Sequence, residues 1–403
     1  MTASNPTSSL TKAFEHQEKT FASAFSILQK GIAEHAFPAA SVAVTHRRRL
    51  IALKTLGAFT YEPNSPTVSP TTLFDLASLT KIVATTTMAM ILYERGLLDI
   101  DAPVAAILPE FTTTAEKDPR RDEVTIRMLL SHSSGLPAYE KLFLKARTRA
   151  ELLHAALTMP LAADPAARAE YSDIGFIILG IALERLADES LDRFCQREIF
   201  APLAMTNTTF NPPANLRSQI PPTADEREEL GGSDTFVRQL PKADELPSVS
   251  LRSTFRQRII QGEVQDENAS ALGGVAAHAG LFSTAQDLAI FAHALLSRTN
   301  PILRPETVSL FTRREPAPMG TSRALGWDTP SAPSQSGKYF SPQSFGHLGY
   351  TGTSLWIDPA RQLSITLLTN RTWPDCSNQA IKGIRPIFHD AVIEALENAP
   401  YPA

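Results

Sequence analysis

The stretch Thr72-Leu73-Phe74-Asp75-Leu76-Ala77-Ser78-Leu79-Thr80-Lys81 is the part of the chain around which the remaining residues are best interpreted. An apolar, strand-like run ends at Ser78, and a helical pattern begins there, with apolar residues at spacings of three and four, and ends at Gly96. We expect Ser78 near a helix N-terminus, where free backbone N–H groups and the helix dipole favour negative charge. Lys81 lies one turn later on the same face, within reach of the Ser78 hydroxyl. A serine with an amine one turn away is the minimal arrangement for an activated oxygen nucleophile.

The tetrapeptide by itself has little specificity, because the chain carries it twice. Ser9-Leu10-Thr11-Lys12 has the same letters in a polar segment with no strand before it, and we interpret that copy as a chance occurrence. For Ser78, the structural alternative is a helix-capping serine followed by a solvated lysine. Other motifs are needed to decide between the two interpretations.

Length and composition indicate an ordinary globular protein. The chain has 403 residues, 43% hydrophobic and 20% charged, with a formal net charge of −4, so no nucleic-acid partner is expected. The basic run His46-Arg47-Arg48-Arg49 lies between two strand-like runs, at 40–45 and 50–56, which indicates a solvated hairpin turn.

The cysteines and the N-terminus bear on the compartment. Cys195 and Cys376 are too few for a disulfide framework, and Cys195 is expected to be an ordinary buried thiol. No apolar run reaches the length of a membrane span. The first residues lack the order of a secretory signal peptide, which favours a soluble cytoplasmic protein, or a periplasmic or secreted one if a leader has been trimmed away.

Helical patterns occupy the first residues and the middle of the chain. Residues from Ser8 to about His35 predict an amphipathic helix, and further helices are expected after Asp173, at 191–200 and up to Leu296. For the helix ending at Leu296, Ser283 and Gln286 are expected to form a capping box. The Pro-rich residues 212–265 are too long for a simple connection and predict a lid or a small irregular subdomain.

Strand patterns lie near both ends of the chain. Residues 345–359 and 363–369 predict strands and a hairpin turn, and 381–396 a closing helix. We therefore expect an α/β fold of the α+β type: one antiparallel sheet built from both chain ends and flanked by helices, with a mostly helical insertion. The expected subdomains are 1–75 with 320–403, and 76–319. Ser78 would lie where they meet, a natural place for a cleft.

Three short motifs then stand in order: Ser78-Leu79-Thr80-Lys81, Tyr171-Ser172-Asp173 and His347-Leu348-Gly349. With their flanks, they resemble the motifs of penicillin-recognising serine hydrolases, which include class C β-lactamases, D-alanyl-D-alanine carboxypeptidases, D-aminopeptidases and carboxylesterases of the same fold. The resemblance extends from about Gln29 to the last helix.

The resemblance implies a role for each motif. Ser78 would be the nucleophile that becomes acylated, with Lys81 and Tyr171 sharing the proton transfer. Both side chains have ordinary pKa values near 10, and burial with a neighbouring ammonium is expected to depress both pKa values in a coupled titration. The backbone N–H groups of Ser78 and Tyr350 would hold the oxyanion. His347 would contact the substrate, and Gly349 would let it approach closely.

The sequence departs from the β-lactamase pattern at two positions. Asp173 stands where β-lactamases have Asn, so an amide donor to the substrate is lost and a negative charge is gained. His347 replaces a lysine, which removes a permanent cation. Both changes weaken the case for an anionic β-lactam. For Gln265, which begins another family-like stretch, the sequence suggests no role, and His132, in a small-residue loop, is expected to fix that loop by hydrogen bonds.

The resulting prediction is a serine hydrolase of small esters or amides, with a carboxylesterase favoured and neither a cofactor nor a metal expected. A D-stereospecific peptidase or carboxypeptidase and a weak β-lactamase are the alternatives among enzymes. A non-catalytic, penicillin-binding-like module is the alternative of another class. A zinc hydrolase is disfavoured because no His-Glu-x-x-His motif occurs, and an α/β-hydrolase because no Gly-x-Ser-x-Gly occurs.

Overall fold

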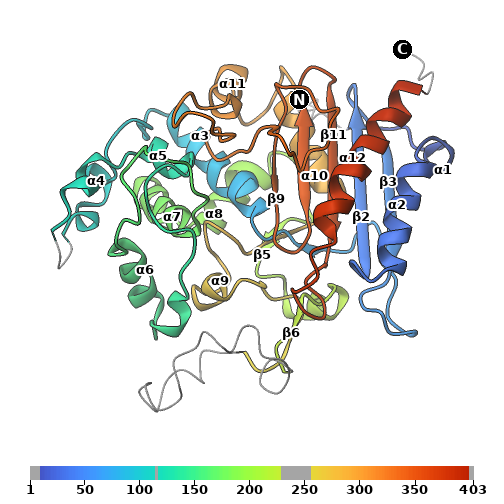
Figure 1. The fold of residues 1–403 in the computed structure, drawn as a ribbon, viewed down its shortest axis with the longest axis horizontal. Coiled ribbons are helices and arrows are strands. Elements are labelled where there is room, and N and C mark those ends of the chain that lie inside the picture. Colours follow the sequence, from blue (N-terminus) through green and yellow to red (C-terminus); the bar gives the residue numbers. More distant parts are fainter. Residues whose placement is uncertain (1–9, 114–116, 228–255, 399–403) are drawn as a thin grey trace, which may run out of the picture.

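The fold combines a central antiparallel sheet with a large helical region (Figure 1). The computed structural model describes residues 10–113, 117–227 and 256–398. The main sheet has six strands in the order β1-β3-β2-β11-β10-β9, and every neighbouring pair except β1 and β3 is antiparallel. Strands from the two ends of the chain meet where β2 pairs with β11. The expected sheet built from both chain ends is thus confirmed, whereas the division into subdomains at 1–75 with 320–403 and at 76–319 stays a prediction.

The strands range from two to nine residues in length. They are β1 (Thr11–Lys12), β2 (Ala39–His46), β3 (Arg49–Gly57), β4 (Phe74–Asp75), β5 (Thr209–Phe210), β6 (Ala224–Asp225), β7 (Ile259–Ile260), β8 (Leu281–Ser283), β9 (Phe345–Leu348), β10 (Ser354–Asp358) and β11 (Leu363–Thr369). A small sheet, β4-β8-β5, lies beneath the helical region, and β6 pairs with β7.

The helical elements comprise α-helices of four to 18 residues, together with π-helical and 3-10 turns. The α-helices are α1 (Gln17–Thr20), α2 (Ala22–Ala33), α3 (Thr87–Glu94), α4 (Val104–Ile107), α5 (Ile126–Leu130), α6 (Arg149–Leu157), α7 (Asp173–Ala187), α8 (Leu191–Cys195), α9 (Glu267–Ala271), α10 (Ala285–Leu296), α11 (Pro305–Thr312) and α12 (Ile381–Asn398). The π-helical turns are η1 (Lys81–Thr86), which runs on into α3, and η5 (Gln196–Phe200). The 3-10 turns are η2 (Pro109–Phe111), η3 (Pro119–Glu123), η4 (Leu142–Leu144) and η6 (Ala214–Gln219).

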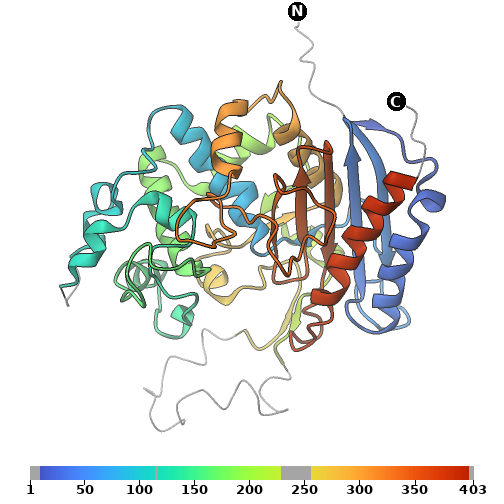
Figure 2. The ribbon, with the colours of Figure 1, turned by 45° about the horizontal axis from the view of Figure 1, so that its top comes forward.

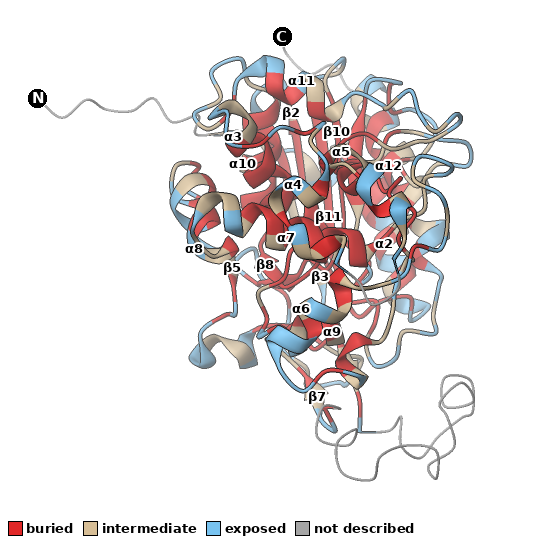
Figure 3. Cartoon of the chain, turned by 90° about the vertical axis from the view of Figure 1, so that its left-hand side faces the viewer, coloured by how far each residue is buried: buried red, intermediate tan, exposed pale blue. Residues whose placement is uncertain are grey.

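Helices cover both faces of the main sheet. On one face α2 and α12 lie side by side (Figures 1 and 2), and apolar side chains such as Phe25, Trp356 and Phe388 form a core between them and the strands. On the other face, α10 packs on β2 and β11 and joins a larger core with α3 and α7. The buried colour in Figure 3 follows the strands and these inner helices. Because strands β2 and β11 are covered on both faces, nearly all their residues are buried, including the polar Ser364 and Thr366 of β11.

Several expected elements have the expected form. The basic turn is a tight hairpin between β2 and β3, in which Arg47 and Arg48 both adopt positive φ. The helix that follows Ser78 ends at Gly96, whose φ of +69° is the left-handed conformation that glycine supplies without strain. Among the described helices, none is long and apolar enough to cross a membrane.

Two expectations about helix starts are wrong. The first residues do not form one helix to His35, because Thr11–Lys12 pairs with β3 as a strand and the helical residues divide into α1 and α2. Helix α10 is capped one residue later than expected, by Thr284, whose side chain accepts the Asp287 N–H. Ser283 instead ends strand β8, so the local capping pattern lost to sheet pairing.

The Pro-rich segment 212–265 is described only at its two ends. Residues 228–255, and with them the centre of the predicted lid or subdomain, lie outside the described residues. The ends meet in the small sheet of β6 and β7, next to a buried ion pair of 2.7 Å between Glu226 and Arg256.

Candidate active site

The segment that carries Ser78 is fixed on both sides by the small sheet beneath it. Strand β4 pairs with β8, and the N–H of Leu76 then donates to the Leu281 carbonyl at 2.9 Å. Ala77 has a φ of +47°, and its N–H donates to the Asp75 carboxylate at 2.8 Å. A left-handed alanine is uncommon and persists only where its surroundings hold it. The chain therefore presents Ser78 on a tight, well-supported turn.

The backbone N–H of Ser78 is free, but its neighbours are not. The N–H groups of the next three residues, at 79–81, each donate to the carbonyl three residues before, at 3.0–3.1 Å. Within the described residues, the Ser78 N–H has no such acceptor. The tight turn thus occupies the N–H groups of residues 79–81, and the free N–H group expected at this helix start is that of Ser78.

Two side chains converge on the Ser78 hydroxyl. Lys81 Nζ lies 3.1 Å and the Tyr171 hydroxyl 2.7 Å from Ser78 Oγ. Lys81 is fully buried, with 0% of its side chain exposed, so the alternative of a solvated lysine beside a capping serine is wrong. Ser78 and Lys81, one helical turn apart, thus share one hydrogen-bonded cluster with Tyr171, which lies 93 positions further along the chain than Ser78.

Two more groups complete the surroundings of Lys81. Its ammonium donates to Asp173 Oδ1 at 2.6 Å and to the His278 carbonyl at 2.9 Å. Nζ also lies 4.9 Å from the centroid of the Tyr171 ring. Asp173 keeps 17% of its side chain exposed and faces both the buried lysine and the site opening.

Tyr171 is held by the N-terminus of α7. Ser172 caps this helix, since its hydroxyl accepts the Gly175 N–H at 3.0 Å and donates to the Pro137 carbonyl at 2.7 Å. His132 Nδ1 accepts the Ser172 N–H at 3.0 Å, and its ring lies 4.6 Å from that of Tyr171. The interpretation of His132 as a histidine that fixes loops by hydrogen bonds is confirmed.

The pKa values of Lys81 and Tyr171 shift upward, against the expectation that both would be depressed. Burial works to lower the pKa of Lys81, but the charge of Asp173, together with Tyr171, outweighs it and raises that pKa. Burial, followed by the charge of Asp173, raises the pKa of Tyr171 to about 12 against the opposing effect of Lys81. For Lys81, the expectation left out the direct contact with Asp173. For Tyr171, it took burial to lower the pKa of a phenol, whereas burial raises that pKa because it disfavours the charged phenolate.

His347 lies on edge strand β9, beside the Tyr171 ring at a centroid distance of 5.8 Å. Its Nδ1 donates to the Leu348 carbonyl at 2.7 Å, which leaves Nε2 as a buried acceptor without a partner among the described residues. Burial, followed by the charges of Lys81 and Arg323, lowers the pKa of His347 to about 3. His347 is therefore neutral near pH 7 and differs from a lysine in both charge and hydrogen-bonding direction.

The turn after β9 is tied to the nucleophile segment. Thr351 Oγ1 donates to the Asp75 carbonyl at 2.8 Å, and Thr353 Oγ1 donates to the Leu76 carbonyl at 3.0 Å. A Cβ on Gly349 would lie 2.5 Å from the same Leu76 carbonyl, so the protein's own packing requires glycine there. The Tyr350 N–H, in this turn, donates to no acceptor in the described part of the chain. The turn that carries this free N–H group is thus tied to residues 75 and 76, just before Ser78.

Two features of the site have no signal in the sequence. Arg323 places its guanidinium 5.5 Å from the centroid of the Tyr171 ring, with 22% of its side chain exposed and a distant ion contact of 3.9 Å to Asp328. The backbone N–H of Gln265 donates to Asp75 Oδ2 at 2.7 Å, which gives Gln265 a structural role in supporting the turn before Ser78. Both contacts depend on backbone placement over long sequence distances.

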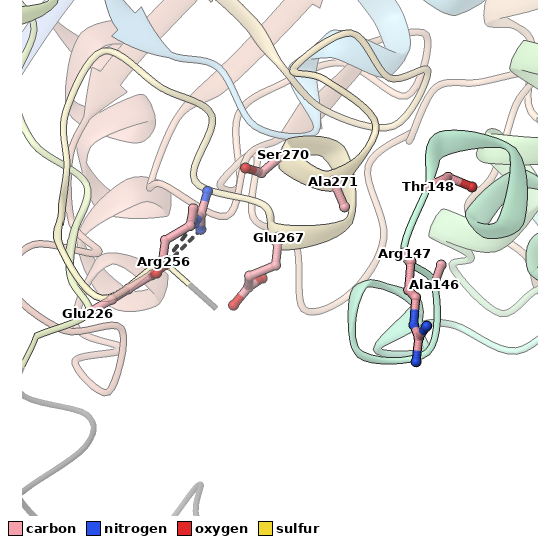
Figure 4. A pocket seen from close by; sticks show the side chains of 8 residues that line it. All are labelled: Ala146, Arg147, Thr148, Glu226, Arg256, Glu267, Ser270 and Ala271. Carbon is pink, nitrogen blue, oxygen red and sulfur yellow. Dashed lines mark hydrogen bonds and ion pairs between the residues drawn. The ribbon is translucent and has the colours of Figure 1, made fainter. Parts of the chain in front are cut away.

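An acidic and aromatic rim adjoins the cluster. Burial raises the pKa of Tyr139, and the charge of Glu267 adds to this effect. Burial also raises the pKa of Tyr350, followed by its hydrogen bond with Cys376. A cavity of about 180 Å³ opens on the outer side of Glu267 (Figure 4). It is lined by Ala146, Arg147, Thr148, Glu226, Arg256, Glu267, Ser270 and Ala271, and by none of the residues of the Ser78 cluster.

Cys195 lies away from this site in the helical core, where burial raises the pKa of its thiol well above the usual value. The interpretation of Cys195 as an ordinary buried thiol is confirmed.

Comparisons with known proteins identify the family of the chain. The family model described as Beta-lactamase matches residues 24–382. The chain is 32% identical over 317 residues to "N-acetylmuramyl-L-alanine amidase" of Bacillus subtilis (strain 168), covering 74% of this chain and 68% of the relative. It is 30% identical over 328 residues to "Putative D-alanyl-D-alanine carboxypeptidase" of Salmonella agona (strain SL483), covering 77% of this chain and 72% of the relative.

A solved structure shows the same fold. "EstCE1, a hydrolase with promiscuous acyltransferase activity" superposes with a TM-score of 0.72 over 93% of this chain and 99% of its own, at 22% identity. At that identity the likeness concerns the fold alone. The match over most of the chain, together with the two relatives, shows that the chain belongs to the β-lactamase family of serine hydrolases.

Proposed function

We propose that the protein hydrolyses small ester or amide substrates through a covalent acyl-enzyme on Ser78. The observation that carries this proposal is the convergence of Lys81 Nζ and the Tyr171 hydroxyl on Ser78 Oγ, at 3.1 and 2.7 Å. A serine oxygen is a weak nucleophile until a neighbouring group takes its proton. Both neighbours lie within the distance that proton transfer requires.

In the proposed acylation step, Ser78 Oγ attacks the substrate carbonyl, and its proton passes into the cluster with Lys81 and Tyr171. The carbonyl oxygen becomes an oxyanion, for which the two free N–H groups, of Ser78 and Tyr350, are the donors. The leaving group takes the proton as its bond to the acyl carbon breaks. Water then attacks the acyl carbon and gives a proton to the cluster. The cluster returns a proton to Ser78 Oγ as the bond between Oγ and the acyl carbon breaks and the acid is released.

The residues around the opening bear on the substrate. His347 is neutral and offers an acceptor, so it gives no permanent cation for a carboxylate, and Asp173 adds a negative charge. We therefore propose a small, uncharged acyl group, which favours a carboxylesterase over a β-lactamase. His347, Asp173 and Gly349 are the proposed residues on the substrate side of the cluster.

An amide substrate is the second candidate, and the two relatives favour it. Their names are those of an amidase and a carboxypeptidase, both of which cleave amide bonds, at 32% and 30% identity. The same cluster serves an amide, provided that the leaving amine is protonated. Protonation of the leaving group is more important for an amide than for an ester, because an amine is a poorer leaving group than an alcohol.

Intact-protein mass spectrometry with peptide mapping tests the proposal. The protein is mixed briefly with p-nitrophenyl acetate, benzylpenicillin or N-acetylmuramyl-L-alanyl-D-isoglutamine in separate samples, with Ser78→Ala and Ser9→Ala as matched controls. We expect an acetyl adduct on Ser78 that is absent in Ser78→Ala and present in Ser9→Ala. Cleavage of the muramyl peptide would favour the amidase, and a lasting penicilloyl adduct a peptidase or a β-lactamase. No adduct and no turnover with any of the three would reject the enzyme in favour of a binding module.

A further inference from the structure

The hydrogen bonds of Lys81 account for every proton of an ammonium. An ammonium has three N–H donors, and Nζ has three acceptors: Ser78 Oγ, Asp173 Oδ1 and the His278 carbonyl, at 3.1, 2.6 and 2.9 Å. The lysine side chain is fully buried, so these groups stand in for water. A buried ammonium with three acceptors, one of them a carboxylate, is strongly favoured over a neutral amine.

Ser78 cannot pass on its hydroxyl proton while Lys81 is an ammonium and Tyr171 is a neutral phenol. Its oxygen then accepts one hydrogen from Lys81 and one from Tyr171. Its own hydrogen has no further acceptor among the residues that the structure describes. One proton must therefore leave Lys81 or Tyr171 before either of them can receive the Ser78 proton.

Asp173 makes both of these losses harder, but not equally. Its carboxylate is in direct contact with the ammonium and acts on the phenol from farther away. Removing the proton of Lys81 would leave a buried carboxylate without its counter-ion, whereas removing that of Tyr171 keeps the pair intact. The phenol is therefore the group from which the cluster loses its proton.

We propose that Asp173 is a positioning residue, whose ion pair keeps Lys81 as an ammonium so that the Tyr171 oxygen takes the Ser78 proton. The reaction then requires a pH high enough for Tyr171 to lose its own proton. The inference rests on the proposed function and adds which group is the base. As pH rises, Tyr171 releases its proton to solvent. The phenolate then accepts the Ser78 proton while the Oγ–carbon bond forms, and returns it to the leaving group when the bond to that group breaks. Lys81 remains charged throughout and stabilises the phenolate.

Other charged and titratable groups face the cluster, but among the described residues only Asp173 is a carboxylate in contact with Lys81. His132 and His347 stay neutral because burial, together with nearby cations, lowers their pKa values. Asp266 acts on Lys81 from farther away, and its own carboxylate binds His278 Nε2 at 2.9 Å and caps α9. Arg323 lies over the Tyr171 ring and opposes the effect of Asp173 on the phenol, since a cation favours the phenolate. A test of the inference should therefore remove the charge of Asp173.

The first test is the pH profile of kcat/KM for p-nitrophenyl butyrate in wild type and Asp173→Asn. The variant keeps an oxygen to accept from Lys81 but has no charge. We expect the rising limb to move to lower pH by at least about one unit, because both Lys81 and Tyr171 lose a proton more readily. Asp164→Asn is the matched control: it removes the same charge from a surface pair with Arg120, at 2.9 Å, and should leave the limb in place.

The second test does not need turnover. NMR of protein labelled at the lysine ε-carbon follows the charge of Lys81, and its signal is assigned by its loss in Lys81→Met. In wild type we expect this signal to show an ammonium across the rising limb of activity, and in Asp173→Asn to titrate at lower pH. A rising limb and a Lys81 titration that are the same in both proteins would overturn the inference, and so would a neutral Lys81 in active wild type. Failure of wild type to form an acyl adduct would reject the proposed function instead.

Discussion

The chain contains Ser-Leu-Thr-Lys twice, and the two copies have opposite surroundings. In the first copy, Thr11 and Lys12 are exposed in strand β1, at the edge of the main sheet. In the second, Thr80 is buried, donates to the Ala77 carbonyl at 2.6 Å and accepts the Leu281 N–H at 3.1 Å. Lys81 is buried with three acceptors around its ammonium.

The difference shows that the tetrapeptide provides a serine and a lysine, whereas the fold determines their burial and their hydrogen-bond partners. In the second copy, a turn before the serine, a tyrosine from the start of α7 and a carbonyl from the loop before β8 meet one lysine. In the part of the first copy that the structure describes, residues 10–12, Thr11 and Lys12 instead pair with β3. Variants made in pairs, one at each copy, therefore separate the motif from its surroundings.

The largest effect is expected for Ser78→Ala. Removing the attacking oxygen should lower kcat/KM for p-nitrophenyl butyrate by roughly 10⁴-fold or more, as for other catalytic serines that act with a base. The fold should remain, since Ser78 is small and its backbone holds the turn. Steady-state kinetics and circular dichroism measure the two properties, and Ser9→Ala should match wild type in both. An equal loss of kcat/KM in Ser78→Ala and Ser9→Ala would contradict the proposal that the surroundings of Ser78 make it the nucleophile.

Lys81→Met is expected to have the next largest effect. It removes the ammonium from the cluster and should lower kcat by about 10³-fold. It also leaves Asp173 without its counter-ion, and should reduce the free energy of unfolding by about 1 to 3 kcal/mol, less than for a fully buried pair because Asp173 keeps some contact with water. Urea unfolding measures the stability, with Lys12→Met, at an exposed position, as the control. A Lys81→Met protein as stable as Lys12→Met would argue against the ion pair.

Tyr171→Phe removes one hydroxyl and keeps the ring. If the phenol takes the Ser78 proton, kcat should fall by about 10²-fold or more, with little change in stability. Pre-steady-state release of p-nitrophenol measures the acylation step itself. A loss of less than about tenfold, equal to 1.4 kcal/mol, would reduce Tyr171 to a packing residue and transfer the base to Lys81.

His347→Ala should have the smallest effect. The residue is neutral and beside the cluster rather than in contact with Ser78, so kcat/KM is expected to fall by about tenfold or less, mostly through KM. Because the pKa of His347 is about 3, the variant should keep the shape of the pH profile above about pH 5. A change in the rising limb in this variant would show that His347, and not only Asp173, controls the charge of the cluster.

Much of the fold could be predicted from the sequence because local signals agreed with tertiary packing. The periodicity of the closing helix, the hairpin at the basic turn and the strands at both ends all depend on residues close together in the chain. The first residues were predicted less well, since sheet pairing of Thr11 and Lys12 with β3 overrode a weak helical pattern. The cap of α10 moved by one residue for the same reason.

The sequence by itself determined which groups the site contains. Ser78 and Lys81 are one helical turn apart, so any helix there brings the amine to the hydroxyl, and ordered motifs with their flanks identified Tyr171 and His347. Only the tertiary structure decided how those groups are charged. Asp173 reaches Lys81 across 92 positions of sequence. Arg323 reaches the Tyr171 ring, and the Gln265 N–H reaches the Asp75 carboxylate in the turn before Ser78, across still longer distances. Charge depends on burial and on distance in space, and neither is a property of neighbouring letters.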